Sequence, residues 1–103
     1  MADPLATILT ERLGCRLPVI QTAMGWIATP GLVIASSEAG AFGFLAGAVM
    51  QPAELEAAIL AVKAGTKQPF GVNFHMFQPG AGEIVEIILK HRDQIRAVSF
   101  GRG

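Results

Sequence analysis

Cysteine is nearly absent from this chain of 103 residues, which contains only one, Cys15. A single cysteine excludes an internal disulfide and suits a protein of a reducing compartment, so we expect a cytoplasmic location. Because Cys15 comes just before an apolar segment, we interpret it as a small buried hydrophobe rather than as a nucleophile.

The chain also lacks an excess of charge of either sign, with 8 Lys and Arg residues against 8 Asp and Glu residues. The charges are spread along the chain without a basic cluster, so we expect no nucleic acid partner. No apolar run approaches the ~20 residues of a membrane span, and no basic segment leads into an apolar one at the N-terminus. We therefore expect no membrane partner and no secretion signal, and we predict no metal site.

What the chain has in abundance is apolar side chains, which make up 51% of its residues and give a mean hydropathy of +0.48. A small domain buries a smaller share of its surface than a large one and usually needs fewer apolar residues than this. We therefore expect the sequence to be part of a larger folded body.

Apolar residues recur with two different spacings along the chain. Helical spacing links Leu5, Ile8, Leu9 and Leu13, and Gly14 follows where a left-handed helix cap is expected. Short apolar runs bounded by turn residues are typical of buried strands. We predict strands at residues 17–21, 42–46, 70–74 and 97–100, and helices at residues 5–13, 31–39, 52–64 and 82–90.

The alternation of strands and helices is typical of a parallel α/β fold. Strand centres near Ile20, Phe44, Val72 and Val98 are 24, 28 and 26 residues apart, which suits a closed barrel of β/α units. A doubly wound sheet allows similar spacing, but no GxGxxG follows the first strand and no acidic residue ends the second, which disfavours a dinucleotide site. We predict a partial (β/α)8 TIM barrel, with residues 1–103 as the first three and a half β/α units of one domain.

A loop of small residues follows the first strand. Ala23 and Gly25 carry little or no side chain, so the peptide groups around Met24 can lie against a flat ligand. The same residues are also consistent with a simple tight turn between a strand and a helix. We interpret Trp26 and, after the third strand, Met76 as pocket wall or core.

Alternation along the third strand places Asn73 on one face with Gly71 and His75, and the large apolar Val72 and Phe74 on the other. Because the two apolar side chains should pack under the helices, we predict that Asn73 points toward the barrel axis, where its amide can donate and accept hydrogen bonds. Capping of the following loop is the alternative for Asn73. A hydrogen bond to backbone or water is the alternative for His75.

Three segments together resemble the start of the nitronate monooxygenases, also called 2-nitropropane dioxygenases, namely residues 18–26, 37–44 and 69–74. These enzymes are FMN-dependent (β/α)8-barrel flavoproteins, and the resemblance covers about residues 9–103. The first motif of the family usually reads Gln-Ala/Gly-Pro/Gly-Met-Gly/Ala, from which Thr22 and Ala23 depart. Since the loop contacts flavin mainly through its backbone, this departure costs little chemically, although the loss of proline leaves the loop less rigid.

The resemblance implies that Ala23, Met24 and Gly25 line the isoalloxazine ring of FMN and that Asn73 hydrogen-bonds the cofactor. By alternation, His75 faces the same mouth as Asn73 and is the candidate for contact with a small-molecule substrate. It further implies oxidation of alkyl nitronates with oxygen to a carbonyl compound and nitrite. The phosphate anchor and the catalytic base are expected beyond Gly103, so we expect residues 1–103 alone to be inactive.

Two alternatives accompany this interpretation. Flavin-type enoyl-acyl carrier protein reductases open in much the same way and would carry out a different reaction on the same scaffold. A non-catalytic barrel fragment would instead persist by pairing its open sheet edges, near Ile20 and Val98, with another chain such as a second copy.

Overall fold

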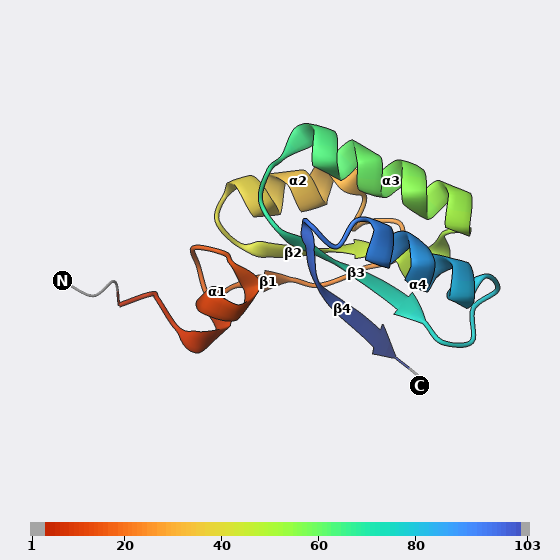
Figure 1. The fold of residues 1–103 in the computed structure, drawn as a ribbon. Coiled ribbons are helices and arrows are strands. Elements are labelled where there is room, and N and C mark those ends of the chain that lie inside the picture. The colour runs from red at the N-terminus through yellow and green to blue at the C-terminus, as the bar shows by residue number, and fades with distance from the viewer. Residues whose placement is uncertain (1–3, 102–103) are drawn as a thin grey trace.

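A computed structural model describes residues 4–101 of the chain. Its centre is a four-stranded parallel sheet in the order β1-β2-β3-β4, in which each strand lies beside the next one in sequence (Figure 1). The strands are β1 (Ile20–Gln21), β2 (Phe42–Ala46), β3 (Phe70–His75) and β4 (Ile95–Gly101). A doubly wound sheet reverses its strand order at a switch point, so this sequential order is that of a β/α barrel and confirms the predicted fold class.

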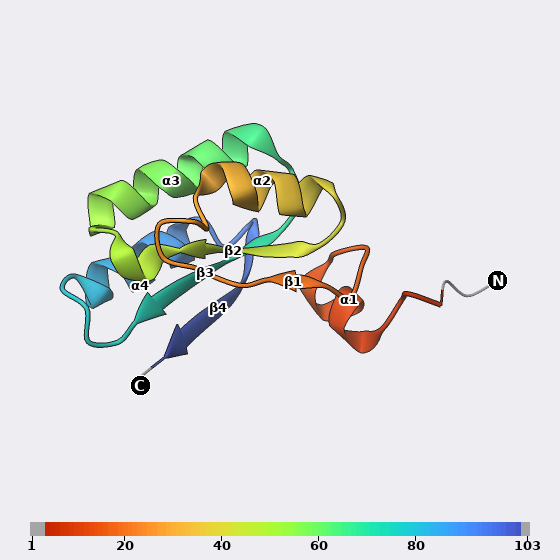
Figure 2. The same cartoon turned by 180° about the vertical axis from the view of Figure 1, so that it is seen from behind.

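Three helices connect the strands and lie together on one side of the sheet (Figures 1 and 2). They are α2 (Pro30–Glu38), α3 (Pro52–Gly65) and α4 (Ala81–Lys90), and prolines in the first turn start the first two. Among residues 4–101, no helix is long and apolar enough to cross a membrane. The core lies between these helices and the sheet and includes Val33, Leu45, Leu55, Ile59, Val62, Phe70, Val72, Phe74, Ile84, Ile88 and Ile95.

The two faces of β3 differ in the way that alternation requires. Val72 and Phe74 are 0% and 4% exposed and belong to the core under the helices. Asn73 and His75 are half-buried and lie on the opposite face, with Asn73 in register with Ser99 of β4. Asn73 therefore points away from the helix layer, as the alternation along β3 predicts.

Strand β4 forms one edge of the described sheet, and its helix-side residues are not covered. Val98 and Phe100 are in register with Val72 and Phe74 and share their face, yet they are 45% and 56% exposed. The Phe74 and Phe100 rings touch at a centroid separation of 6.4 Å. About half of Val98 and of Phe100 is therefore exposed, at the position where the next helix of a barrel packs.

Strand β1, at the other edge, is shorter than the predicted residues 17–21. The pairing with β2 is limited to residues 20–21, although the Phe42 N–H also donates to the Val19 carbonyl oxygen at 2.9 Å. Pro18 has no N–H to donate, and β1 has a neighbour on one side only within residues 4–101. Cys15, just upstream, is half-buried rather than buried, and its thiol donates to a nearby backbone carbonyl.

The first helix, α1 (Ile8–Leu13), lies by the amino-terminal ends of the strands. Thr7 caps its N-terminus, and Gly14 caps its C-terminus with φ 75°, as predicted. The Arg96 guanidinium of β4 donates to the Arg12 carbonyl oxygen at 3.0 Å and ties the helix to the sheet. Its apolar stripe is not covered, and Ile8 is 73% exposed.

One element of the structure has no counterpart in the sequence-based prediction. After β2 the chain makes a single 3₁₀ turn, η1 (Gly47–Val49), before α3 begins. The other differences are shifts of element boundaries. Helix α1 starts at Ile8 rather than at residue 5, and β4 starts at Ile95 rather than at residue 97. Apart from β1, the remaining boundaries differ by at most one residue. Turn η1 lies at the carboxyl-terminal end of the sheet, where the candidate site is found.

Candidate functional site

The loop between β1 and α2 presents free backbone donors at the carboxyl end of β1. Within residues 4–101, the N–H groups of Met24, Gly25 and Trp26 donate to no other protein group. Two backbone hydrogen bonds within the loop close its turn: the Met24 carbonyl oxygen accepts from the N–H groups of Ile27 at 3.0 Å and Ala28 at 2.8 Å. Because Met24 and Gly25 are both exposed, the free donors are accessible to a ligand.

This loop is fixed by contacts with the end of β2 and with η1. The Ala46 N–H donates to the Ala28 carbonyl oxygen at 3.1 Å, and Ala28 is fully buried. A Cβ atom at Gly25 would lie 3.3 Å from Cγ1 of Val49 in η1, which is a tight contact. The free donors of the β1–α2 loop therefore have a position set by the core-forming strand β2.

Turn η1 in turn lies against the end of β3. A Cβ atom at Gly47 would lie 2.5 Å from the backbone oxygen of Asn73 and 3.2 Å from Cδ1 of Leu55. Only glycine leaves room for this approach. The connections after β1, β2 and β3 thus form one continuous edge that runs from Met24 to Asn73.

We expect Gly47→Ala to lower the free energy of unfolding of the chain by roughly 1–3 kcal/mol, because the new methyl group meets a backbone oxygen that cannot rotate away. The matched control is Gly82→Ala in α4, where a Cβ atom has nothing within 4 Å and the helix gains a better helix former. Denaturant unfolding of both variants measures the difference. Equal stability of the two variants would show that η1 does not rest on β3.

The side chain of Asn73 is oriented by the neighbouring strand. Its Nδ2 donates to Oγ of Ser99 at 3.0 Å and to the Ser99 carbonyl oxygen at 3.3 Å. The amide nitrogen is thereby turned toward β4, so the side-chain carbonyl oxygen is the atom available to accept from a ligand. Ser99 was not singled out in the sequence, because strand register is needed to place it beside Asn73.

Gln78 links the connection after β3 to the connection after β2. The sequence analysis did not predict this role. Its Oε1 accepts from the His75 backbone N–H at 2.7 Å, and its Nε2 donates to the carbonyl oxygens of Gly47 at 3.1 Å and Met50 at 3.3 Å. The side chain therefore fastens the β3–α4 loop to η1. A glutamine in a loop gives no sequence signal for such a role, since the two carbonyl partners of its Nε2 are about 30 residues away.

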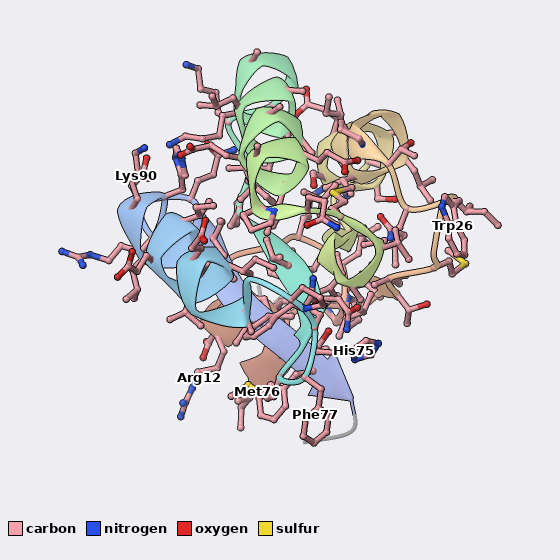
Figure 3. The ribbon with its side chains drawn as sticks, turned by 90° about the vertical axis from the view of Figure 1, so that its right-hand side faces the viewer. Arg12, Trp26, His75, Met76, Phe77 and Lys90 are labelled. Carbon is pink, nitrogen blue, oxygen red and sulfur yellow. The ribbon has the colours of Figure 1, made fainter. Side chains whose placement is uncertain are left out.

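Figure 3 looks onto this end of the molecule and labels Trp26, His75 at the end of β3, and Met76 and Phe77 of the β3–α4 connection. Trp26, Met76 and Phe77 are 82%, 51% and 75% exposed. Within residues 4–101, Trp26 and Met76 therefore do not belong to the core, and their role as pocket wall stays a prediction. His75, on the open face of β3, is half-buried.

A charged network between α3 and α4 lies outside this edge. His91 is 6% exposed, with Nδ1 3.1 Å from Nζ of Lys63 and Nε2 3.3 Å from Oε2 of Glu56. The hydrogen bond from Lys90, followed by that from His91, holds the pKa of Glu56 below its ordinary 4.5, and Lys63 does the same to the pKa of Asp93. Lowered carboxyl pKa values contribute stability at neutral pH that is lost as the pH falls through them.

The donor set of the edge fits a flat heteroaromatic cofactor better than a metal ion. Residues 4–101 contain no group of three His, Cys, Asp or Glu side chains that could hold a metal. Free backbone N–H groups, a bare backbone at Gly25 and the Asn73 carbonyl oxygen suit the nitrogen and oxygen atoms of a flavin ring. The assignment of Ala23, Met24, Gly25 and Asn73 to the cofactor and of His75 to the substrate stays a prediction.

Sequential parallel strands, a one-sided helix layer and a site edge at the carboxyl ends define a segment of a β/α barrel. Solved structures agree with this fold class. FabK from Thermotoga maritima superposes with a TM-score of 0.88 at 34% identity, over 95% of this chain and 31% of that chain. The enoyl reductase domain of MlnA from Bacillus amyloliquefaciens gives a TM-score of 0.78 over 92% of this chain and 23% of that chain, and its 24% identity supports the fold alone.

The chain belongs to the nitronate monooxygenase family, whose sequence profile matches residues 6–100. A (3aS,4S,5R,7aS)-5-hydroxy-7a-methyl-1-oxo-octahydro-1H-indene-4-carboxyl-CoA dehydrogenase of Mycobacterium tuberculosis is 48% identical over 96 residues, which are 93% of this chain and 26% of the relative. The enzyme of that name from Rhodococcus jostii is 43% identical over 93% of this chain and 27% of its own length. A nitronate monooxygenase of Pseudomonas aeruginosa is 35% identical over 72% of this chain and 21% of its own length.

These relatives confirm the resemblance that the sequence motifs carry, and they are oxidoreductases. The chain spans only about a quarter of the length of the curated relatives that it matches.

Proposed function

We propose that this chain forms one wall of the FMN site of an oxidoreductase of the nitronate monooxygenase family. The observation that supports this most is the continuous edge from Met24 to Asn73, which combines free backbone donors with an oriented amide acceptor. In this role the N–H groups of the β1–α2 loop donate to acceptor atoms of the ring, and Gly25 lets the backbone approach it. The Asn73 carbonyl oxygen accepts from a ring N–H.

FMN supplies the redox chemistry when it is bound, and the contribution of the chain is to bind and orient it. Gln78 and Ser99 keep the end of β3 in place beside η1, so the ring meets groups that need no rearrangement. In this proposal, segments beyond Gly103 supply the phosphate anchor and the catalytic base.

For the substrate we propose a cyclic acyl-CoA thioester that undergoes dehydrogenation. The two relatives at 48% and 43% identity are dehydrogenases of an indene-carboxyl-CoA, which supports this class. Large exposed apolar side chains at the same end of the sheet, Trp26 and Phe77 among them, suit a substrate with a hydrocarbon ring. The alternative from the sequence, reduction of an enoyl thioester, would act on a substrate of the same class, an acyl thioester.

Oxidation of an alkyl nitronate to a carbonyl compound and nitrite is the second candidate. The Pseudomonas aeruginosa nitronate monooxygenase, at 35% identity, and the family itself support it. A small nitronate has little apolar surface, however, so it would leave the exposed apolar side chains at this end of the sheet without a contact.

The test is a barrel graft, in which this chain replaces the matching segment of the Mycobacterium tuberculosis relative. We expect the barrel graft to bind FMN in about equimolar amount and to oxidise the indene-carboxyl-CoA substrate of that relative with a higher kcat/KM than propyl-2-nitronate. The unaltered relative serves as the folding and activity control. A barrel graft that folds but binds no FMN would reject the proposed function, and preference for the nitronate would favour the second candidate.

A further inference from the structure

Trp26 has a backbone conformation that disfavours its own side chain. Its φ is +63°, and it is the one non-glycine residue with a positive φ among residues 4–101. For a bulky residue this left-handed conformation is a genuine outlier, whereas glycine adopts it freely. Strain of this kind persists only where the surrounding structure fixes the backbone, and strained residues cluster at active sites and ligand clamps.

The strain arises from the turn at residues 24–27. The Ile27 N–H donates to the Met24 carbonyl oxygen at 3.0 Å, so Trp26 is the third residue of a four-residue turn. A positive φ at the third position is where turns of this geometry favour glycine. In this chain the glycine, Gly25, stands one position earlier, and tryptophan takes the strained place.

Nothing within the described chain accounts for a tryptophan at this position. Its side chain is 82% exposed, and no hydrogen bond or ring contact of its indole is present among residues 4–101. Its flanking residues Met24 and Ile27 are also exposed, at 39% and 62%. The indole is thus held out at the same end of the molecule as His75 and Phe77 (Figure 3), next to the free donors of Met24 and Gly25.

We propose that Trp26 is a specificity-determining residue whose indole packs against the hydrocarbon ring of the acyl thioester substrate. This inference rests on the proposed function, since it needs FMN in the adjacent edge and substrate over it. An indole offers the largest apolar face of any side chain, together with one N–H donor for a polar tip. A cyclic acyl group can cover such a face, whereas a short alkyl nitronate cannot.

The test compares Trp26→Gly and Trp26→Phe in the barrel graft, with Leu60→Ala on the exposed side of α3 as the matched loss of exposed apolar surface. For Trp26→Gly we expect an unchanged or higher Tm, because glycine removes the strain, and an FMN Kd within about threefold of the parent graft. We expect kcat/KM for the indene-carboxyl-CoA substrate to fall about tenfold or more, and kcat/KM for propyl-2-nitronate to fall less than about twofold. Trp26→Phe should recover most of the lost kcat/KM, and Leu60→Ala should leave kcat/KM unchanged for both substrates.

The inference is overturned if Trp26→Gly lowers kcat/KM for both substrates equally or for neither. It is also overturned if Trp26→Gly lowers the Tm by several degrees, since the indole then packs against another part of the protein rather than against substrate. FMN binding by the parent graft decides the proposed function separately, so failure of one can be told from failure of the other.

Discussion

Asn73→Ala in the barrel graft is expected to weaken FMN binding by about one to two decades in Kd, and His75→Ala by much less. Removing one partner of a buried polar contact costs about 1–3 kcal/mol, which corresponds to that change in affinity. The Asn73 side chain is held on the face of β3 opposite the helices by hydrogen bonds to Ser99, whereas His75 lies two residues further along the strand. Flavin titration of the two purified variants measures the difference.

Two variants sharpen this prediction. Asn73→Asp keeps an acceptor oxygen but cannot donate to Ser99, so it should lose affinity through misorientation as well as through its added charge. Gln94→Ala removes an amide that donates to the Thr66 and Gln68 carbonyl oxygens before β3, and it should leave FMN affinity unchanged. If Asn73→Ala binds FMN as tightly as the parent graft, the assignment of Asn73 to the cofactor is wrong.

The isolated chain of residues 1–103 is expected to associate and to hold FMN only weakly. Both sheet edges are open, and the apolar side chains of Val19, Ile20, Val98 and Phe100 are between 40% and 56% exposed. Leaving such a side chain in water forgoes about 1.5–3 kcal/mol each, and several together rival the ~5–15 kcal/mol of a whole domain. Open strand edges also invite pairing with a second copy.

Analytical ultracentrifugation with parallel FMN titration tests this expectation. The unaltered chain should sediment as more than one species, and the double variant Val98→Lys, Phe100→Lys should sediment more nearly as a monomer. Lys67→Arg, on the exposed connection before β3, is the control for a surface change that leaves both edges intact. A monodisperse unaltered chain with micromolar or tighter FMN affinity would contradict the expectation.

Much of the fold follows from local patterns that the sequence carries in full. Alternation places Val72 and Phe74 under the helices, the first-turn proline Pro52 starts α3, and Gly14 caps α1 in the left-handed conformation. These features depend on residues close together in the chain. They are therefore available without coordinates.

What sequence patterns miss depends on contacts between distant residues. The closeness of Gly47 to the Asn73 oxygen, the fastening of two connections by Gln78 and the network around His91 all join residues 26 or more positions apart. The exposure of Trp26 likewise depends on how the turn at residues 24–27 is closed. Motifs thus locate the candidate site, but only the packed structure shows how its pieces are held together.

The most direct test of the account is amide hydrogen exchange of the barrel graft with and without FMN. We expect FMN to protect residues 22–27 and 71–75, which form the proposed wall, and to leave the exposed side of α3 unchanged. Protection should be weaker in residues 71–75 of Asn73→Ala at equal occupancy of FMN. A barrel graft that binds FMN in full, yet shows no protection in either segment, would contradict the claim that this chain forms a wall of the flavin site.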